Sequence, residues 1–159
     1  MKTLIICSVL VFVFLFYIKP IEVVAIPSHQ STVLIKSWAL PMPSNQNSGF
    51  AVTSSFSGNE IYYVDSNSNT IGRLAPTTNL ITEWNIPTAN SLPTSIKFDA
   101  TTGSVYFIES NSNTIGRLVP FSNAFTEWNL QEKPSDIEID SAGNIHYIDE
   151  NGTKIVRMD

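Results

Sequence analysis

The sequence predicts an all-β fold, a β-propeller of four-stranded antiparallel blades, and two observations predict it. First, the chain repeats itself: residues 61–87 and 105–131 match at 16 of 27 positions, and a weaker third copy begins at Ile145. Second, the copies are 44 and 40 residues apart and consist of short β-prone segments separated by Asn, Ser, Gly and Pro. This period and composition are typical of propeller blades. The chain is expected to hold about three of them, as a partial ring or one completed by oligomerisation.

Residues 1–25 are predicted to be a targeting segment outside the blades. Sixteen uncharged, mostly apolar residues, 3–18, follow Lys2, and small residues lie around Ala25, where a signal peptidase would cut. Two interpretations stay open: a cleaved signal peptide, or a membrane anchor, because sixteen residues are just short of the roughly 17–25 that span a bilayer. Residues 26–31 are expected to be a linker. The predicted localisation is secreted, or anchored to the outer face of the cell membrane.

The rest of the chain is acidic. After Ala25 it has seven Lys and Arg against thirteen Asp and Glu, a net charge of −6, and no basic cluster. This balance argues against nucleic acid and anionic lipid surfaces as partners. Cys7 is the single cysteine and lies in the targeting segment. No intramolecular disulfide is therefore available, and stability must come from packing and strand pairing.

The central repeat, residues 95–129, best displays the strands of one blade. Residues 94–99 alternate, which places Ile96 and Phe98 on one face. Three more strands are expected after polar turns, over 105–109, 114–119 and 124–129. Asn67 to Asn69 and Asn111 to Asn113 are expected as hairpin turns, since Asn tolerates a left-handed backbone.

The flanking repeats have the same parts. The first blade is predicted over 51–85, with its innermost strand at 51–55 and its outermost at 81–85. The third, 136–158, has three strands, at 136–140, 145–149 and 154–158. A lone strand of the outermost type, 32–40, precedes the first blade and carries Trp38, which corresponds to Trp84 and Trp128. Propeller domain and blades together occupy 32–159.

This strand count predicts an assembly. A spare outermost strand at the front and a missing one at the end would let two chains complete each other. The expectation is a homodimer that closes a six-bladed ring, because known propellers have about four to eight blades.

The repeat resembles the streptogramin lyase family, of virginiamycin B lyase type, and the related SMP-30/gluconolactonase-like propellers. The resemblance covers residues 37–159. It rests on Tyr106 to Glu109, on Asn113 to Leu118 (Asn-Thr-Ile-Gly-Arg-Leu), on Thr126 to Asn129 (Thr-Glu-Trp-Asn), and on a proline before the next inner strand.

The resemblance implies a scaffold and argues against its chemistry. The family lyases are larger, seven-bladed rings that use Mg²⁺ and a general-base histidine, in a Glu-Pro-His sequence where an inner strand begins. Here the corresponding stretches are Leu92-Pro93-Thr94 and Lys133-Pro134-Ser135, with neither the histidine nor the glutamate. No catalytic residue and no cofactor are therefore expected. Mg²⁺ would be required only if the lyase alternative holds.

Candidate site residues follow from the inner strands. Thr94, Ser95, Ser135 and Asp136 are expected to form the polar mouth of a pocket and to contact a ligand. Glu109 is the one weak candidate for a metal ligand. It shares its position with Asp65 and Asp149, and these acids are expected to pair with the recurring arginines, Arg73, Arg117 and Arg157. His146 occupies the place of Tyr62 and Tyr106 and is interpreted as structural. Gly72 and Gly116 are expected to permit close sheet-to-sheet approach.

The sequence therefore predicts an exported or membrane-tethered propeller that acts as a non-catalytic binding or scaffold module. Its partner would be a small molecule, a glycan or a protein. Two alternatives stay open: a Mg²⁺-dependent C–O lyase or lactonase-like enzyme, and a fragment of a longer propeller.

Overall fold

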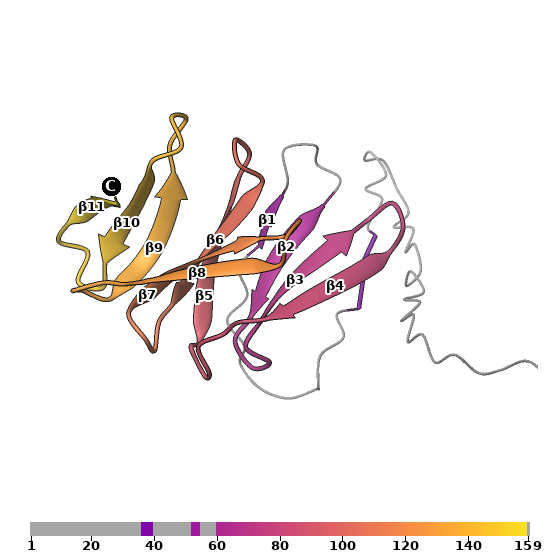
Figure 1. Cartoon of the computed structure of the whole chain (residues 1–159), viewed down its shortest axis with the longest axis horizontal. Helices are drawn as coiled ribbons and strands as arrows, with labels where there is room; N and C mark the ends of the chain where they lie inside the picture. The colour runs from indigo at the N-terminus through magenta and orange to yellow at the C-terminus, as the bar shows by residue number, and fades with distance from the viewer. Residues whose placement is uncertain (1–35, 40–51, 55–59, 159) are drawn as a thin grey trace, which may run out of the picture.

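The computed structural model describes residues 36–39, 52–54 and 60–158, and these form an all-β fold without helices. Eleven strands make three antiparallel sheets that stand side by side in chain order (Figure 1). The predicted targeting segment and linker, and most of the predicted strand 32–40, lie outside the described residues; Ser37 within 36–39 forms an isolated bridge. No helix in the described part of the chain is long and apolar enough to cross a membrane.

Blade 1 and blade 2 are four-stranded sheets, and blade 3 has three described strands. Each sheet is a simple meander in which successive strands pair. Blade 1 contains β1 (Val52–Ser54), β2 (Ile61–Asp65), β3 (Thr70–Ala75) and β4 (Leu80–Asn85); blade 2 contains β5 (Pro93–Asp99), β6 (Ser104–Glu109), β7 (Thr114–Val119) and β8 (Ala124–Asn129); blade 3 contains β9 (Pro134–Ile139), β10 (Ile145–Asp149) and β11 (Ile155–Met158). The predicted propeller of antiparallel blades is confirmed.

The inner strands of blades 2 and 3 begin earlier than predicted. Pro93 pairs with Glu109 and Pro134 pairs with Asp149, in each case beside a register shift. Both prolines are the first residues of edge strands, where a missing backbone N–H removes no ladder hydrogen bond.

The turns use the residues that their backbone requires. Asn69 and Asn113 close the second hairpin of blades 1 and 2 at φ of 58° and 53°, as predicted for left-handed Asn. Asn79 and Asn123 close the third hairpin at 58° and 55°. An Asn tolerates this region better than most residues because its short polar side chain bonds locally.

The core consists of two apolar layers between consecutive blades. Blades 1 and 2 bury one set of residues between them (Tyr62, Val64, Ile71, Ile86, Ile96, Val105, Phe107 and Leu118), and blades 2 and 3 bury another (Tyr106, Ile108, Ile115, Ile137 and Tyr147). Every residue of β6 is buried, because alternate side chains enter the two layers. Ile96 and Phe98 share one layer, as their alternation predicts.

Gly72 and Gly116 permit a close approach within one sheet, which corrects the prediction of an approach between sheets. Gly116 pairs with Phe107 across β6 and β7, and a Cβ at Gly116 would lie 2.2 Å from the Cζ of that ring. At Gly72 the corresponding atom is Cζ of Tyr63, at 1.9 Å. The far end of the cross-strand ring thus lies against the glycine in both blades.

Candidate functional site

The inner strands of blades 2 and 3 place four polar side chains along a common rim. Ser95 Oγ on β5 donates a hydrogen bond of 3.0 Å to Asp136 Oδ1 on β9. Two residues further along each strand, Lys97 Nζ lies 2.7 Å from a carboxylate oxygen of Glu138. These four residues are called the rim below. The rim joins consecutive blades through one hydroxyl–carboxylate contact and one ion pair.

Two of the four predicted ligand-contacting residues lie in the rim and two do not. Ser95 and Asp136 meet, as described above. Thr94 Oγ1 instead shares a hydrogen bond of 2.7 Å with Ser110 Oγ inside blade 2. Ser135 Oγ donates to the carbonyl oxygens of Ile148 and Asp149, each at 3.2 Å, inside blade 3. Thr94 and Ser135 therefore brace their own blades at the start of the inner strand.

Lys97 and Glu138 were not predicted as site residues. Their positions carry no distinguishing motif, and one polar position along an alternating strand looks like another. The signal that could have identified them is spacing, because each stands two residues after a predicted rim residue and so points to the same side.

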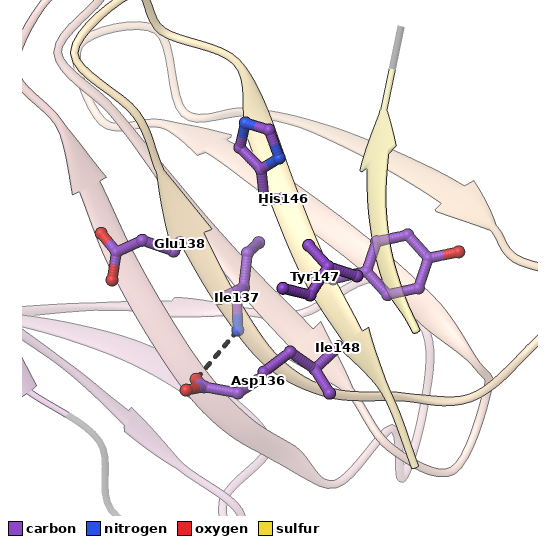
Figure 2. Close-up of a pocket in the computed structure, with 7 residues that line it drawn as sticks. Asp136, Ile137, Glu138, His146, Tyr147 and Ile148 are labelled. Carbon is purple, nitrogen blue, oxygen red and sulfur yellow. Dashed lines mark hydrogen bonds between the residues drawn. The ribbon is translucent and has the colours of Figure 1, made fainter. Parts of the chain in front are cut away.

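A cavity of about 210 Å³ adjoins the rim on blade 3 (Figure 2). Asp136 and Glu138 border it from β9, and His146 and Ile148 border it from β10. The remaining lining residues are Ile137, Tyr147 and Ile155. The cavity thus combines apolar walls with carboxylates at its border, which suits an amphipathic group more than a purely polar one.

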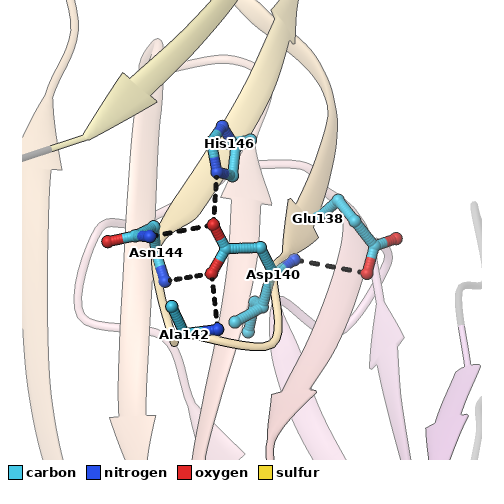
Figure 3. Close-up of polar contacts among 6 residues, drawn as sticks. Glu138, Asp140, Ala142, Asn144 and His146 are labelled. Atoms are coloured by element: carbon cyan, nitrogen blue, oxygen red, sulfur yellow. Dashed lines mark hydrogen bonds and ion pairs between the residues drawn. The ribbon is translucent and has the colours of Figure 1, made fainter.

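His146 stands where the first two blades have Tyr62 and Tyr106, since all three pair with the recurring arginine in the next strand. Its ring, however, has a polar partner: Nε2 lies 3.0 Å from Oδ2 of Asp140 (Figure 3). Asp140 also accepts from the backbone N–H groups of Ala142 and Asn144, and from the Asn144 side chain at 2.8 Å.

This cluster closes the hairpin between β9 and β10. The hydrogen bonds from the Asn144 side chain and from His146 hold the pKa of Asp140 well below its usual range. Asp140 is consequently a carboxylate at any ordinary pH, and it fixes the orientation of His146. The structural interpretation of His146 is consistent with this geometry.

The predicted pairing of repeated acids with repeated arginines is wrong for the first blade. Asp65 accepts hydrogen bonds from the Asn67 N–H, at 2.9 Å, and from the Ser68 hydroxyl. Arg73 instead forms an ion pair with Glu60 at 3.2 Å. The reason is register: Asp65 is opposite Thr70, while Arg73 is opposite Tyr62.

Asp149 repeats the hairpin role of Asp65 in blade 3. Its carboxylate accepts from the backbone N–H groups of Thr153 and Lys154 at 2.8 and 2.7 Å. A short aspartate at the end of the second strand therefore holds the following turn, which satisfies backbone donors that the ladder leaves unpaired.

Glu109 occupies the same position in blade 2 but has a different environment. Its side chain is fully buried, and neither carboxylate oxygen has a hydrogen-bond partner within ordinary geometry in the described part of the chain. Burial raises the pKa of Glu109 to about 7, and the nearby Glu127 carboxylate adds to the rise.

The second acid near Glu109 is explained by the repeat. In blade 1, the Tyr63 hydroxyl donates a hydrogen bond of 3.1 Å to Glu83. In blade 2 the ring at that position is Phe107, which has no hydroxyl. Glu127, the counterpart of Glu83, accepts instead from the Thr88 backbone N–H at 3.3 Å and hydroxyl at 3.0 Å.

These surroundings bear on the suggestion that Glu109 holds Mg²⁺. Mg²⁺ usually keeps several water ligands, and a fully buried carboxyl between packed blades leaves no room for them. Within the ranges that the structure describes, no group of three or more His, Cys, Asp or Glu could hold a metal ion. The environment of Glu109 suits a neutral carboxylic acid, and its role as a metal ligand stays a prediction.

Comparison with solved structures places this fold among known propellers. Virginiamycin B lyase from Staphylococcus aureus superposes with a TM-score of 0.63 at 24% identity, over 70% of this chain and 38% of that one. A catalytically inactive variant of the same lyase, solved with quinupristin, gives a TM-score of 0.63 at 25% identity, over 74% of this chain and 40% of that one. A hydrazine synthase of Kuenenia stuttgartiensis gives 0.55 at 15% identity, over 76% of this chain and 38% of that one.

Other comparisons give no match: no family model and no curated protein matches the sequence. The chain spans about two fifths of the length of the lyases that it superposes on. The described blades nevertheless superpose on those lyases, and this chain has a streptogramin lyase-like β-propeller fold.

Proposed function

We propose that this chain is an exported or membrane-tethered binding module built on a streptogramin lyase-like propeller, without catalysis of its own. The observation that carries the proposal is the residue after each inner-strand proline, Thr94 in blade 2 and Ser135 in blade 3. The resembling lyases have their general-base histidine at that kind of position.

The contacts of these two hydroxyls support the proposal. A general base works best when its pKa lies near the operating pH, and an alcohol without a partner base is far from that range. Thr94 shares its hydrogen bond with Ser110, and Ser135 donates to two backbone carbonyls. Among the residues that the structure describes, neither hydroxyl is hydrogen-bonded to a histidine or a carboxylate that could take its proton.

Binding is supported by the rim and the adjoining cavity. Carboxylates of Asp136 and Glu138 border apolar walls, so a ligand with an apolar body and a hydrogen-bonding or cationic edge would find partners for both. A small molecule, a glycan or a protein segment could each have that character. Quinupristin, which occupies the solved inactive lyase, is a suitable first probe.

The experiment incubates the purified full chain, in detergent, with quinupristin and Mg²⁺, and follows the antibiotic by chromatography and tandem mass spectrometry. We expect the ring to stay intact, as in a control without protein. Ring opening with unchanged mass would overturn the proposal in favour of a lyase, and ring opening with the addition of one water would favour a lactonase-like hydrolase.

Binding is measured separately, by calorimetric titration of the same chain with quinupristin. If the rim contributes, Asp136→Asn should weaken binding several-fold, because a charged hydrogen-bond acceptor is lost. Glu150→Gln is the matched control, since Glu150 is not part of the rim. Its carboxylate instead forms an ion pair with Lys133 at 2.7 Å. Equal affinities for the two variants would remove the rim from the proposal.

A further inference from the structure

The outermost strand of a complete blade covers one particular isoleucine. Trp84 of β4 stands opposite Ile71 of β3, and Trp128 of β8 stands opposite Ile115 of β7. Both isoleucines are completely buried. The corresponding residue of blade 3 is Ile155 in β11, and its exposed fraction is 76%.

A second isoleucine of blade 3 is exposed where the other two blades bury the corresponding residue. Ile148 in β10 corresponds to Val64 and Ile108, which are both fully buried between blades, whereas Ile148 is 37% exposed. Ile148 and Ile155 both line the cavity of Figure 2. Within the described residues, no strand pairs with the outer edge of β11. Edge and cavity together are thus the surface that a fourth strand and a following blade would cover.

The segment around Trp38 has the contacts of such a fourth strand. Trp84 Nε1 of blade 1 donates at 2.6 Å to Asn123, in the third hairpin of blade 2. Trp38 Nε1 donates at 2.8 Å to Asn79, in the third hairpin of blade 1. Trp38 therefore occupies, relative to blade 1, the position that Trp84 occupies relative to blade 2. This is the position of the outermost strand of a preceding blade.

We propose that the outer edge of β11 binds the segment Lys36–Ala39 of a second copy of this chain, with Trp38 of that copy opposite Ile155. The same segment keeps its contact with Asn79 of its own blade 1, so one strand joins two chains. Main-chain pairing at an open edge supplies affinity and the matching side chain supplies specificity. Two chains of three blades related by a twofold axis make a closed ring of six, within the range of known propellers.

The pairing register gives a direct test. In blade 1, Gly72 of β3 is opposite Glu83, the residue before Trp84. By the same register, Val156 of β11 would be opposite Ser37 of the second copy. The test uses the full chain in detergent with Cys7→Ser, Ser37→Cys and Val156→Cys, oxidised mildly and run on a non-reducing gel. We expect a band of two chains that reducing agent converts to one.

Two control variants separate this pairing from association through residues 1–25. Replacing Val156→Cys by Thr153→Cys moves the thiol into the β10–β11 hairpin and should remove the two-chain band. Ile155→Glu, added to the original pair of cysteines, should also remove it, because the charge would face the indole. Leu80→Glu is the matched control on β4, since Leu80 is 49% exposed in a complete blade, and it should leave the band unchanged.

Three results would overturn the proposal. One is a disulfide formed within a single chain, seen as a one-chain band without free thiols. Another is two free thiols after oxidation, which would follow if a longer protein supplied the fourth strand from its own sequence. The third is a two-chain band that persists with Ile155→Glu.

Discussion

At the scale of single residues, one methylene group separates two roles at the same position of the blade. Asp65 and Asp149 are short enough for their carboxylates to accept hydrogen bonds from the turn that follows them. The longer Glu109 side chain lies buried instead, and neither of its carboxylate oxygens has a hydrogen-bond partner of ordinary geometry among the described residues. A buried carboxyl without partners favours its neutral form, because the ionised form would lose its hydration.

This predicts a pH dependence of stability that belongs to Glu109. Its pKa is about 7 in the folded chain, against the usual value of 4.5 that applies when unfolded. Between these values the folded state holds the proton and the unfolded state does not, so the free energy of unfolding falls as pH rises from about 4.5 to 7. A difference of this size corresponds to roughly 3 kcal/mol.

Glu109→Gln tests this, because the amide cannot ionise. Denaturant unfolding at pH 4 and pH 8 should show the variant close to the parent at pH 4 and more stable by roughly 2–3 kcal/mol at pH 8. Glu132→Gln is the control, since it removes the carboxylate of an exposed ion pair with Lys154, and it should not show the gain in stability at pH 8 that is expected of Glu109→Gln. A stability difference between the parent and Glu109→Gln that is constant with pH would contradict the burial argument.

At the scale of elements, the repeated Gly in the third strand and the ring opposite it act as a pair. The Cβ of an alanine at 116 would overlap the Phe107 ring, so the ring or the strand would have to shift. Overpacking of a close-packed core typically costs about 1–3 kcal/mol. The same geometry at Gly72 and Tyr63 explains why the two positions keep a Gly in both blades.

Gly116→Ala should therefore lower the free energy of unfolding by about 1–3 kcal/mol, measured by denaturant titration. In a Phe107→Leu background the same substitution should cost clearly less, because the overlapping ring atoms are gone. The difference between the two costs is the coupling of a double-mutant cycle. Equal costs in both backgrounds would indicate that the effect comes from backbone conformation and not from the ring.

The sequence predicted strands and turns well because each depends on local, repeated signals. Alternation placed Ile96 and Phe98 in one layer, and Asn69 and Asn113 have the left-handed backbone expected of them. Contacts that depend on register were predicted less well. Arg73 binds Glu60 and not Asp65, since spacing along the chain does not say which residues stand opposite one another.

At the scale of the whole molecule, some residues of the candidate site can be predicted from a single blade, and others only from the contacts between neighbouring blades. Ser95 and Asp136 were recognisable from their place at the start of inner strands, and the structure brings them to 3.0 Å. The Lys97–Glu138 pair was not recognised from the sequence, and Glu109 was singled out only as a weak candidate for a metal ligand, not as a buried acid, because both features depend on how neighbouring blades approach. The packing of one blade against the next determines both the Lys97–Glu138 pair and the burial of Glu109. The sequence of a single repeat does not say which residues of two blades meet.

The last prediction concerns export, which the proposed function requires and which rests on the sequence of residues 1–25. Each charged residue near the middle of an apolar targeting segment costs about 2.5–3.5 kcal/mol on insertion scales. Leu10→Asp with Phe12→Asp should therefore retain a reporter fused after Asp159 in the cytosol, whereas the parent fusion crosses the membrane. Leu10→Ile with Phe12→Leu is the control, since it preserves hydrophobicity, and it should be exported like the parent.

Sequencing the N-terminus of the exported chain distinguishes the two forms: a start at Ile26 identifies a cleaved signal peptide, and a retained N-terminal segment identifies an anchor. Export of the double aspartate variant at the parental level would show that these residues do not direct the chain across the membrane.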